Sequence, residues 1–253
     1  MKKIKRAIIS VSDKKYLSPL LKVLRKNKVE IISSGGTYKA IKKLKFDCIE
    51  VSNYTGTPEI LNGRVKTLHP KIHAGILNRR NNKYHYQELI KNNFGNIDLV
   101  IVNFYPFEQT LKNTSIHEKI IENIDIGGPS MVRAAAKNYN DVTVITSNSQ
   151  YSELINEMNR YKGSTSQNFR EKMSQIAFTE TAYYDSIISN YFNRITNNYF
   201  PQKKIIYGNL IEKLRYGENP HQESAMYSKN DLTNLKQLHG KKLSYNNYND
   251  IYA

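Results

Sequence analysis

Short apolar runs rich in β-branched residues alternate with segments of helical period, and this alternation constrains the fold most. The apolar runs lie at residues 7–11, 30–32, 48–51, 99–102 and 142–145. A helix is expected over residues 37–44, and after the first run leucines recur at helical spacing at Leu17, Leu20, Leu21 and Leu24. Strands that alternate with helices predict an α/β fold in which helices flank both faces of a parallel sheet.

Loops rich in glycine and polar residues follow several of the predicted strands. Ligands of such sheets bind outside the carboxyl ends of the strands, where residues 12–14, 34–37 and 103–107 are expected. The segment SSGGT at 33–37 has two interpretations. It is an ordinary turn with a helix N-cap, or it points backbone N–H groups and the positive end of a helix at an anion. Neither a Walker A sequence nor a GxGxxG fingerprint occurs, so neither a nucleoside triphosphatase nor a dinucleotide dehydrogenase is predicted.

The segment GRVKTLHPKIH at 63–73 carries the densest set of reactive side chains. It places Arg64 and Lys66 beside Thr67, His69 and His73, without the period of a helix or strand. Such charges are ordinarily solvated, but their company here favours an anion-handling loop. No Cys, His or carboxylate group shows metal-ligand spacing, so we interpret the histidines as structural hydrogen-bonding residues and predict no metal site.

A helix is predicted to begin at the Gly-Gly-Pro-Ser turn at 127–130 and to present an alanine-rich face. Lys137, further along this helix, has two interpretations. It stabilises the C-terminal end of the helix dipole, or its amine lies among alanines in an apolar setting that lowers its pKa and lets it exchange protons. Asp125, at the entrance, is either a partner of the helix N-terminus or an acceptor for amide protons of a substrate.

Charge and composition exclude several classes of protein. The formal net charge is +16, but the lysines are scattered along all 253 residues, which favours attraction of small anionic substrates over a dedicated nucleic-acid surface. The apolar run after the basic N-terminus is too short for a signal peptide, and no run approaches the roughly 18 apolar residues of a membrane span. A single cysteine, Cys48, excludes an intramolecular disulfide framework. We therefore expect a cytoplasmic enzyme without a membrane or nucleic-acid partner.

These segments together resemble the bifunctional purine-biosynthesis family that combines AICAR transformylase with IMP cyclohydrolase. The motifs that carry the resemblance are SVSDK at 10–14, SSGGT at 33–37, GRVKTLHPKIHAGIL at 63–77, VNFYPF at 102–107, IDIGGPSM at 124–131 and RAAAKN at 133–138. The resemblance implies a cyclohydrolase domain over residues 1–200, with a methylglyoxal-synthase-like parallel sheet flanked by helices. Residues 201–253 then correspond to the incomplete start of a transformylase domain.

The resemblance also implies a reaction and a site. The cyclohydrolase closes formyl-AICAR to IMP with loss of water and needs no cofactor or metal. Lys137 matches the proton donor and acceptor of the family, and Lys66, Tyr105 and Asp125 match its supporting catalytic groups. The substrate-binding positions are Ser12, Asp13, Lys14, Ser34, Gly35, Gly36, Thr37, Arg64, Val65, Thr67, Val102, Asn103, Ile126 and Gly127.

The C-terminal stretch resembles only part of the transformylase. The motifs are LRYGENPHQ at 214–222 and GKKLSYNN at 240–247, in which Arg215 and Tyr216 match AICAR-binding positions. The transformylase of the family uses 10-formyltetrahydrofolate and a Lys-His pair, and this sequence contains no Lys-His dipeptide. We expect this chain not to transfer the formyl group, and we expect the full-length family to form homodimers.

Two other classes of function remain open from the residues. One is a lyase that acts on a triose phosphate, because a methylglyoxal-synthase-like fold would be shared. The RVKT segment at 64–67 and the DIGGP segment at 125–129 argue against it. The other is a basic nucleic-acid binder, which predicts a steep salt dependence of oligonucleotide binding.

Overall fold

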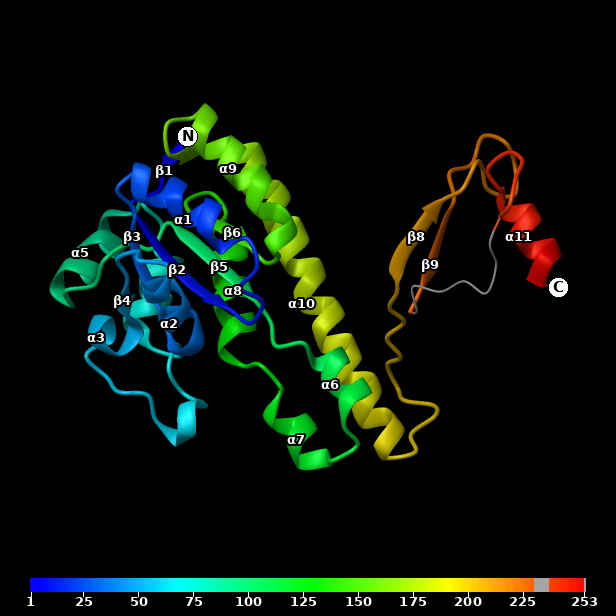
Figure 1. The fold of residues 1–253 in the computed structure, drawn as a ribbon, viewed down its shortest axis with the longest axis horizontal. Helices are drawn as coiled ribbons and strands as arrows, with labels where there is room; N and C mark the ends of the chain where they lie inside the picture. The colour runs from blue at the N-terminus through cyan, green and yellow to red at the C-terminus, as the bar shows by residue number, and fades with distance from the viewer. Residues whose placement is uncertain (230–236, 253) are drawn as a thin grey trace. The chain divides into compact units, whose positions relative to one another are not determined.

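The computed structural model describes residues 1–229 and 237–252, which form two compact units, Met1–Asp185 and Ser186–Ala253. The division falls inside the long helix α10 (Gln167–Ile195), which is drawn in yellow-green in Figure 1. The predicted boundary at residue 200 stays a prediction. No helix in the two described ranges is long and apolar enough to cross a membrane.

A five-stranded sheet forms the centre of the first unit. Its order is β4 (Ile49–Glu50), β3 (Glu30–Ser33), β2 (Arg6–Val11), β5 (Leu99–Asn103) and β6 (Thr143–Ile145), and every neighbouring pair is parallel. In the centre of the sheet, Ile8 pairs with Ile32 on one side and with Val100 on the other, and all three side chains are fully buried. Burial on both faces explains why these strands are continuous apolar runs instead of alternating ones. The predicted α/β fold with a parallel sheet is confirmed.

Helices flank this sheet (Figure 1). They are α1 (Leu17–Lys26), α2 (Gly35–Lys43), α3 (Val51–Thr55), α4 (Pro70–Leu77), α5 (Lys83–Lys91), α6 (Phe107–Asn113), α7 (His117–Glu122), α8 (Gly127–Lys137), α9 (Tyr151–Arg160) and α10. Helix α8 packs on β5 and β6 and is covered by α4, while α1 packs against α9. The leucines spaced for a helix, from Leu17 to Leu24, form the buried face of α1 as predicted. Short elements complete the unit: β1 (Lys2–Lys3) pairs antiparallel with β7 (Ser164–Thr165), η2 (Asn148–Gln150) is a single 3₁₀ turn, and η1 (Leu61–Gly63) is a three-residue turn with positive φ angles.

One predicted strand is shorter than expected. The run at 48–51 forms only the two-residue edge strand β4, and Val51 already begins α3. Only Ile49 and Glu50 find partners on β3. Val51 is instead buried in the core from the first turn of α3.

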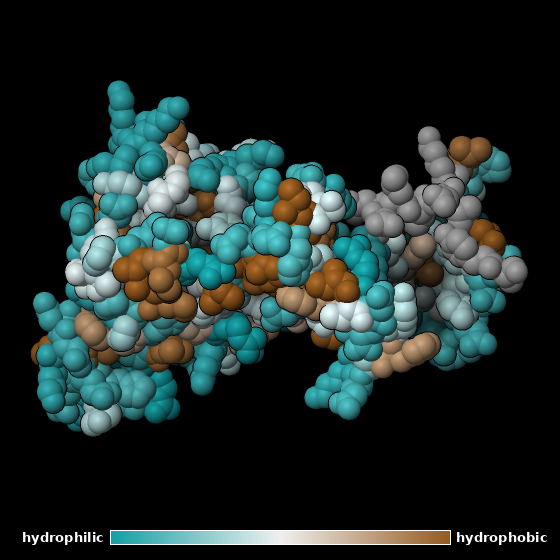
Figure 2. All heavy atoms as spheres, turned by 90° about the horizontal axis from the view of Figure 1, so that it is seen from below, coloured by the Kyte–Doolittle hydropathy of each residue, from teal (hydrophilic) through white to brown (hydrophobic). Residues whose placement is uncertain are grey.

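The second unit contains a small antiparallel sheet of β8 (Asn209–Lys213) and β9 (Ala225–Ser228), followed by α11 (Tyr245–Tyr252). Backbone bonds from Arg215 N–H to Leu243 O and from Tyr245 N–H to Tyr216 O join the segment after β8 to the start of α11. The face of the molecule drawn in Figure 2 is mainly hydrophilic, with separate hydrophobic patches among the polar side chains.

Candidate active site

A cavity of about 800 Å³ lies at the carboxyl edge of the sheet in the first unit. Loops after β2, β3 and β5 and the start of α8 surround it, which is where ligands of parallel sheets bind. Most of the predicted site residues line it: Ser12, Lys14, Ser34, Gly36, Thr37, Arg64, Val65, Lys66, Thr67, Asn103, Tyr105, Asp125, Ile126 and Gly127. The structure therefore brings these residues together around one cavity, and their substrate-binding role stays a prediction.

The start of α2 forms one wall of the cavity and is fixed to β2. The Thr37 hydroxyl accepts a bond from Val11 N–H at 3.0 Å and donates to Val11 O at 2.9 Å. Gly35 has a left-handed backbone with φ +51°, which glycine adopts without steric cost. A Cβ on Gly35 would lie 3.9 Å from Lys66 Nζ, and one on Gly36 would lie 3.8 Å from Lys14 Nζ. Two ammonium groups thus flank a helix N-terminus, an arrangement suited to a phosphate.

The loop after β2 is held by the amide of Asn103. Its Oδ1 accepts the backbone N–H groups of Ser12 at 2.6 Å and of Asp13 at 3.1 Å, and its Nδ2 donates to Asp13 O at 3.2 Å. The Asp13 carboxylate accepts from Lys15 N–H and from the side chain of Asn148. Asn103 and Asp13 therefore shape the loop, and Asp13 is not among the residues that line the cavity.

Asp125 faces the cavity from the turn before α8. Burial raises the pKa of its carboxyl group, although the backbone N–H groups of Gly128 and Tyr105 and the charge of Lys66 oppose this shift. The bond from Gly128 N–H to Oδ1 is 2.8 Å long. A Cβ on Gly128 would overlap the Asp125 carboxylate, so glycine at this position makes room for the acid. The result is a carboxyl group that retains a proton to higher pH than an ordinary aspartate.

The segment 60–67 forms the opposite wall and turns sharply. Leu61, Asn62 and Gly63 all have positive φ angles, of 54°, 53° and 87°, inside a bridge between Ile60 and Val65. This left-handed conformation is unusual for Leu61, whereas asparagine adopts it more readily. It brings Val65, Lys66 and Thr67 into the cavity wall.

Arg64 and the histidines of this segment have structural partners. Arg64 Nη2 lies 2.7 Å from Glu122 Oε1 of α7, and both side chains are exposed. His69 Nδ1 accepts Lys71 N–H at the start of α4, so this imidazole caps a helix. His73 is half-buried, and burial lowers its pKa. Hydrogen bonding is thus the observed role of His69.

Besides Asp13, three further predicted residues of the first unit do not line the cavity in the expected way. Val102 is 1% exposed and belongs to the core beneath the cavity floor. Gly35 lies beside the wall, next to Lys66. Lys137 is the last residue of α8, whereas the cavity meets the first residues of the same helix. Ten helical residues place them about 15 Å apart along the axis.

Of the two interpretations of Lys137, the structure contradicts the apolar setting. Ala134, Ala135 and Ala136 are buried, but the Lys137 side chain is exposed. The alanines pack inward, while the next position around the helix points to solvent because successive residues are about 100° apart. The structure therefore agrees with the interpretation of Lys137 as a cation at the C-terminal end of the helix dipole.

Tyr184 is a residue of this site that the sequence did not indicate. Its hydroxyl accepts Asp125 N–H at 2.8 Å, and its ring packs against Phe104 with centroids 5.0 Å apart. It lies 59 positions after Asp125, on α10. No local motif surrounds it, so only the tertiary contact reveals it.

The two predicted AICAR-binding residues lie in the second unit. Arg215 stacks its guanidinium over the Tyr216 ring at 4.9 Å and donates to the Tyr216 hydroxyl at 3.2 Å. Both groups contact each other, and their binding role stays a prediction.

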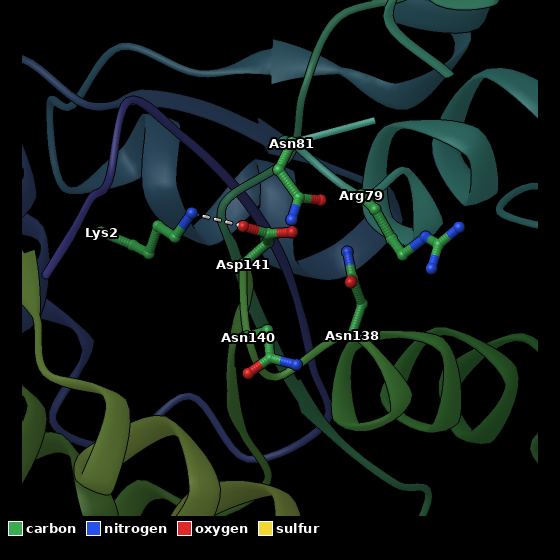
Figure 3. A pocket seen from close by; sticks show the side chains of 6 residues that line it. All are labelled: Lys2, Arg79, Asn81, Asn138, Asn140 and Asp141. Carbon is green, nitrogen blue, oxygen red and sulfur yellow. Dashed lines mark ion pairs between the residues drawn. The ribbon is translucent and has the colours of Figure 1, made fainter. Parts of the chain in front are cut away.

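A second, smaller cavity of about 360 Å³ lies at the amino edge of the sheet (Figure 3). Its polar groups hold the fold together. The Lys2 ammonium is turned toward Asp141, 2.6 Å from Oδ1, and Asp141 Oδ2 also accepts Arg80 N–H at 3.0 Å. Asn138 donates to Ile76 O and to Asn78 O. Because these groups already have partners, the larger cavity is the better candidate for a reaction site.

Comparisons with known proteins agree with the fold. The model of the AICARFT/IMPCHase bienzyme family matches residues 135–253, and that of the MGS-like domain matches residues 16–130. The bifunctional purine biosynthesis protein PurH of Bradyrhizobium diazoefficiens is 46% identical over 100% of this chain and 48% of its own length. PurH of Bacillus subtilis is 44% identical over 99% of this chain and 50% of its own. The chain belongs to this bifunctional purine biosynthesis family.

The match to the family concerns its N-terminal half, since the chain spans about half the length of the curated relatives it matches. Among solved structures, the crystal structure of ForH superimposes with a TM-score of 0.67 at 26% identity. It covers 75% of this chain and 99% of its own. The methylglyoxal-synthase-like fold expected from the resemblance is confirmed.

Proposed function

We propose that the first unit is an IMP cyclohydrolase, which closes the ring of formyl-AICAR to give IMP with loss of water. One observation carries this proposal: groups that suit an anion and groups that suit proton transfer line the same cavity. Lys14 and Lys66 flank the glycines at the start of α2, and Lys66, Tyr105 and Asp125 line the same space. A nucleotide monophosphate needs both an anion site and reactive groups at a fixed separation.

The phosphate binds at the start of α2. Backbone N–H groups in the first turn of a helix lack intrahelical partners and carry partial positive charge. In the part of the chain that the structure describes, neither Lys14 nor Lys66 forms an ion pair with a carboxylate, so their charges are available to an anion. The 5′-phosphate would neutralise them.

Ring closure joins the carboxamide nitrogen to the formyl carbon. An amide nitrogen is a poor nucleophile, so the site must hold the two groups together, accept a proton and stabilise charge on the formyl oxygen. Asp125 accepts the proton from nitrogen, because its raised pKa makes it a stronger base than an exposed aspartate. Lys66 and Tyr105 donate to the formyl oxygen, which leaves as water when its bond to carbon breaks and the formamide nitrogen gives up its proton and forms the C=N bond. The two nitrogens thus lose one proton each, which balances the two protons of the water.

The remaining expectations are also part of the proposal. The nucleotide is the partner, without nucleic acid or membrane, and the reaction takes place in the cytoplasm. Ring closure needs no metal or cofactor, so 10-formyltetrahydrofolate, which serves the transformylase reaction of the full-length family, has no role in it. A homodimer is proposed as the assembly of the full-length family, testable by sedimentation.

The test is a spectroscopic assay of the purified chain. Formyl-AICAR mixed with the chain, in the presence of EDTA and without added cofactor, is expected to show the ultraviolet change of IMP formation. The matched control is the Lys14→Ala/Lys66→Ala variant, which should fold but lose the signal. A rate no higher than that of buffer alone would refute the proposal. Phosphate release from a triose phosphate would support the lyase in its place, and steeply salt-dependent oligonucleotide binding would support the nucleic-acid binder.

A further inference from the structure

The side chain of Tyr184 fastens the turn that carries Asp125 to α10. Tyr184 OH accepts Asp125 N–H at 2.8 Å and lies 3.3 Å from Asn123 O, to which it donates. Both bonds go to backbone atoms, so they fix the path of the chain immediately before α8. The Asp125 side chain remains free to face the cavity.

The same ring contacts the loop that carries Tyr105. Phe104 lies 5.0 Å from the Tyr184 ring and Phe107 lies 6.3 Å from it, in tilted and edge-on geometries. Tyr184 is 6% exposed and Phe107 is 1% exposed, so these two rings are buried, and Phe104 is partly buried. Aromatic pairs of this kind contribute beyond their buried area. One residue therefore joins the two loops that supply Tyr105 and Asp125.

Helix α10 can hold this position because it runs alongside α8 in the opposite direction. Ser174 Oγ donates to Ala136 O at 2.8 Å, Arg133 lies 5.7 Å over the Phe178 ring, and Tyr184 meets Asp125. Residue numbers increase along α10 while those of their partners decrease toward the start of α8, so the two helices are antiparallel. At its beginning, Arg170 donates to Tyr139 O, Asn140 O and Thr165 O. The helix is thus anchored at one edge of the sheet and delivers Tyr184 to the other.

We propose that Tyr184 is a positioning residue for the cyclisation, which holds Asp125 and the Tyr105 loop in register with each other through its hydroxyl and its ring. This inference rests on the proposed function. Tyr184 does not line the cavity, so it acts through Asp125 and not on the substrate. Burial raises the pKa of Tyr184 to about 12, so its hydroxyl keeps its proton throughout the working range.

The decisive variant is Tyr184→Phe, which removes only the hydroxyl. Misplacing a reacting group by about 1 Å can cost about a hundredfold, so we expect kcat to fall about ten- to a hundredfold while KM changes little. The acidic limb of the kcat profile should move to lower pH, because a looser turn lets water reach Asp125 and reduces the upward shift of its pKa. Tyr151→Phe is the matched control, since Tyr151 is buried and its hydroxyl has no partner among the described residues.

A double variant separates positioning from general stability. If Tyr184 acts through Asp125, Tyr184→Phe should cost almost nothing further in the Asp125→Asn background. Full additivity of the two changes would overturn the inference. So would a Tyr184→Phe variant with an unchanged rate, or one whose rate loss merely equals its unfolded fraction with the acidic limb in place.

Hydrogen exchange of the Asp125 amide gives a readout that needs no activity. The Asp125 N–H donates to Tyr184, so its exchange should accelerate at least about tenfold in Tyr184→Phe and not in Tyr151→Phe. Unchanged protection would overturn the positioning role. An inactive parent chain whose Asp125 amide responds in this way would refute the proposed function and leave the fastening of the turn standing.

Discussion

Asp125 and Asp141 stand at opposite edges of the same sheet, one just before α8 and the other just after it, and their pKa values shift in opposite directions. Burial raises the pKa of Asp125, and the N–H groups and the Lys66 charge around it do not cancel this effect. Burial would also raise the pKa of Asp141, but bonds from Lys2 and Arg80 outweigh it and lower the pKa. The comparison shows how to distinguish a carboxylate that stabilises the fold through ion pairs, with a lowered pKa, from one beside a cavity whose pKa is raised by burial.

The difference extends to the whole of each edge. At the amino edge, Asp98 accepts the backbone N–H groups of Lys5 and Arg6 and pairs with Arg80. At the carboxyl edge, the charges of Lys14 and Lys66 lie beside a cavity and have no carboxylate partner within the described ranges. Charges with partners stabilise the fold, whereas charges without partners at a cavity are available to a ligand.

The largest expected effect compares the lysines near the two ends of α8. Lys66→Ala should lower the rate of IMP formation by about 10²–10³, because it removes a preorganised donor to the reacting oxygen. Lys137→Ala should lower the rate of IMP formation far less, since this lysine is exposed at the other end of the helix. Initial rates at saturating formyl-AICAR measure both. An equal loss in the two variants would break the comparison and assign Lys137 the proton-transfer role that the family resemblance implies.

A pair of glycines offers the next contrast. In Gly128→Ala, the new Cβ would displace the Asp125 carboxylate, so kcat should fall by about tenfold or more with little change in melting temperature. In Gly75→Ala, near the amino edge, the Cβ would lie 2.6 Å from Gly95 O, so stability should fall by about 1–3 kcal/mol. Kinetics and urea unfolding on both variants separate the effects. Equal stability losses would mean that Gly128 serves only packing.

Asp141→Asn should destabilise the protein by about 1–3 kcal/mol at neutral pH, because the Lys2 ammonium would lose its buried charged partner. The native pKa of Asp141 is lowered, so its carboxylate stabilises the fold above the unfolded-state pKa, and this contribution is lost as pH falls through the native pKa. Urea unfolding at several pH values should show the variant and the parent converging in acid. A difference in the free energy of unfolding between variant and parent that does not change with pH would contradict this prediction.

The smallest effect has the opposite sign. The native pKa of Asp125 is raised, so the ionised form destabilises the fold at pH above that pKa and has no effect below the unfolded-state value. Asp125→Asn should therefore leave stability unchanged or raise it by up to about 1 kcal/mol at neutral pH, although it lowers the rate of cyclisation by about 10²–10⁴. The asparagine oxygen can still accept Gly128 N–H. A clear loss of stability at neutral pH would place Asp125 with Asp141 among the structural carboxylates.

The sequence predicted the strands well because each is a local run with a clear boundary. It overestimated the strand at 48–51, since nothing local shows that an edge strand finds only two pairing partners. It brought the polar loops together because the carboxyl ends of parallel strands meet at one edge, where these loops line one cavity. It missed Tyr184, because neighbouring residues carry no sign of a hydrogen bond to the backbone 59 positions away.

By itself, the sequence determined the α/β architecture, the loops around the cavity and the family, since all three depend on local period and on motifs that are contiguous in the chain. Only the tertiary structure decided which end of α8 meets the cavity. It placed Asp125 there and Lys137 about 15 Å away along the helix axis. It also decided that Asp141 lies beside Lys2 and Arg80, whereas Asp125 is buried beside the cavity. Those outcomes depend on long-range packing against α10, β1 and β5, which no local pattern records.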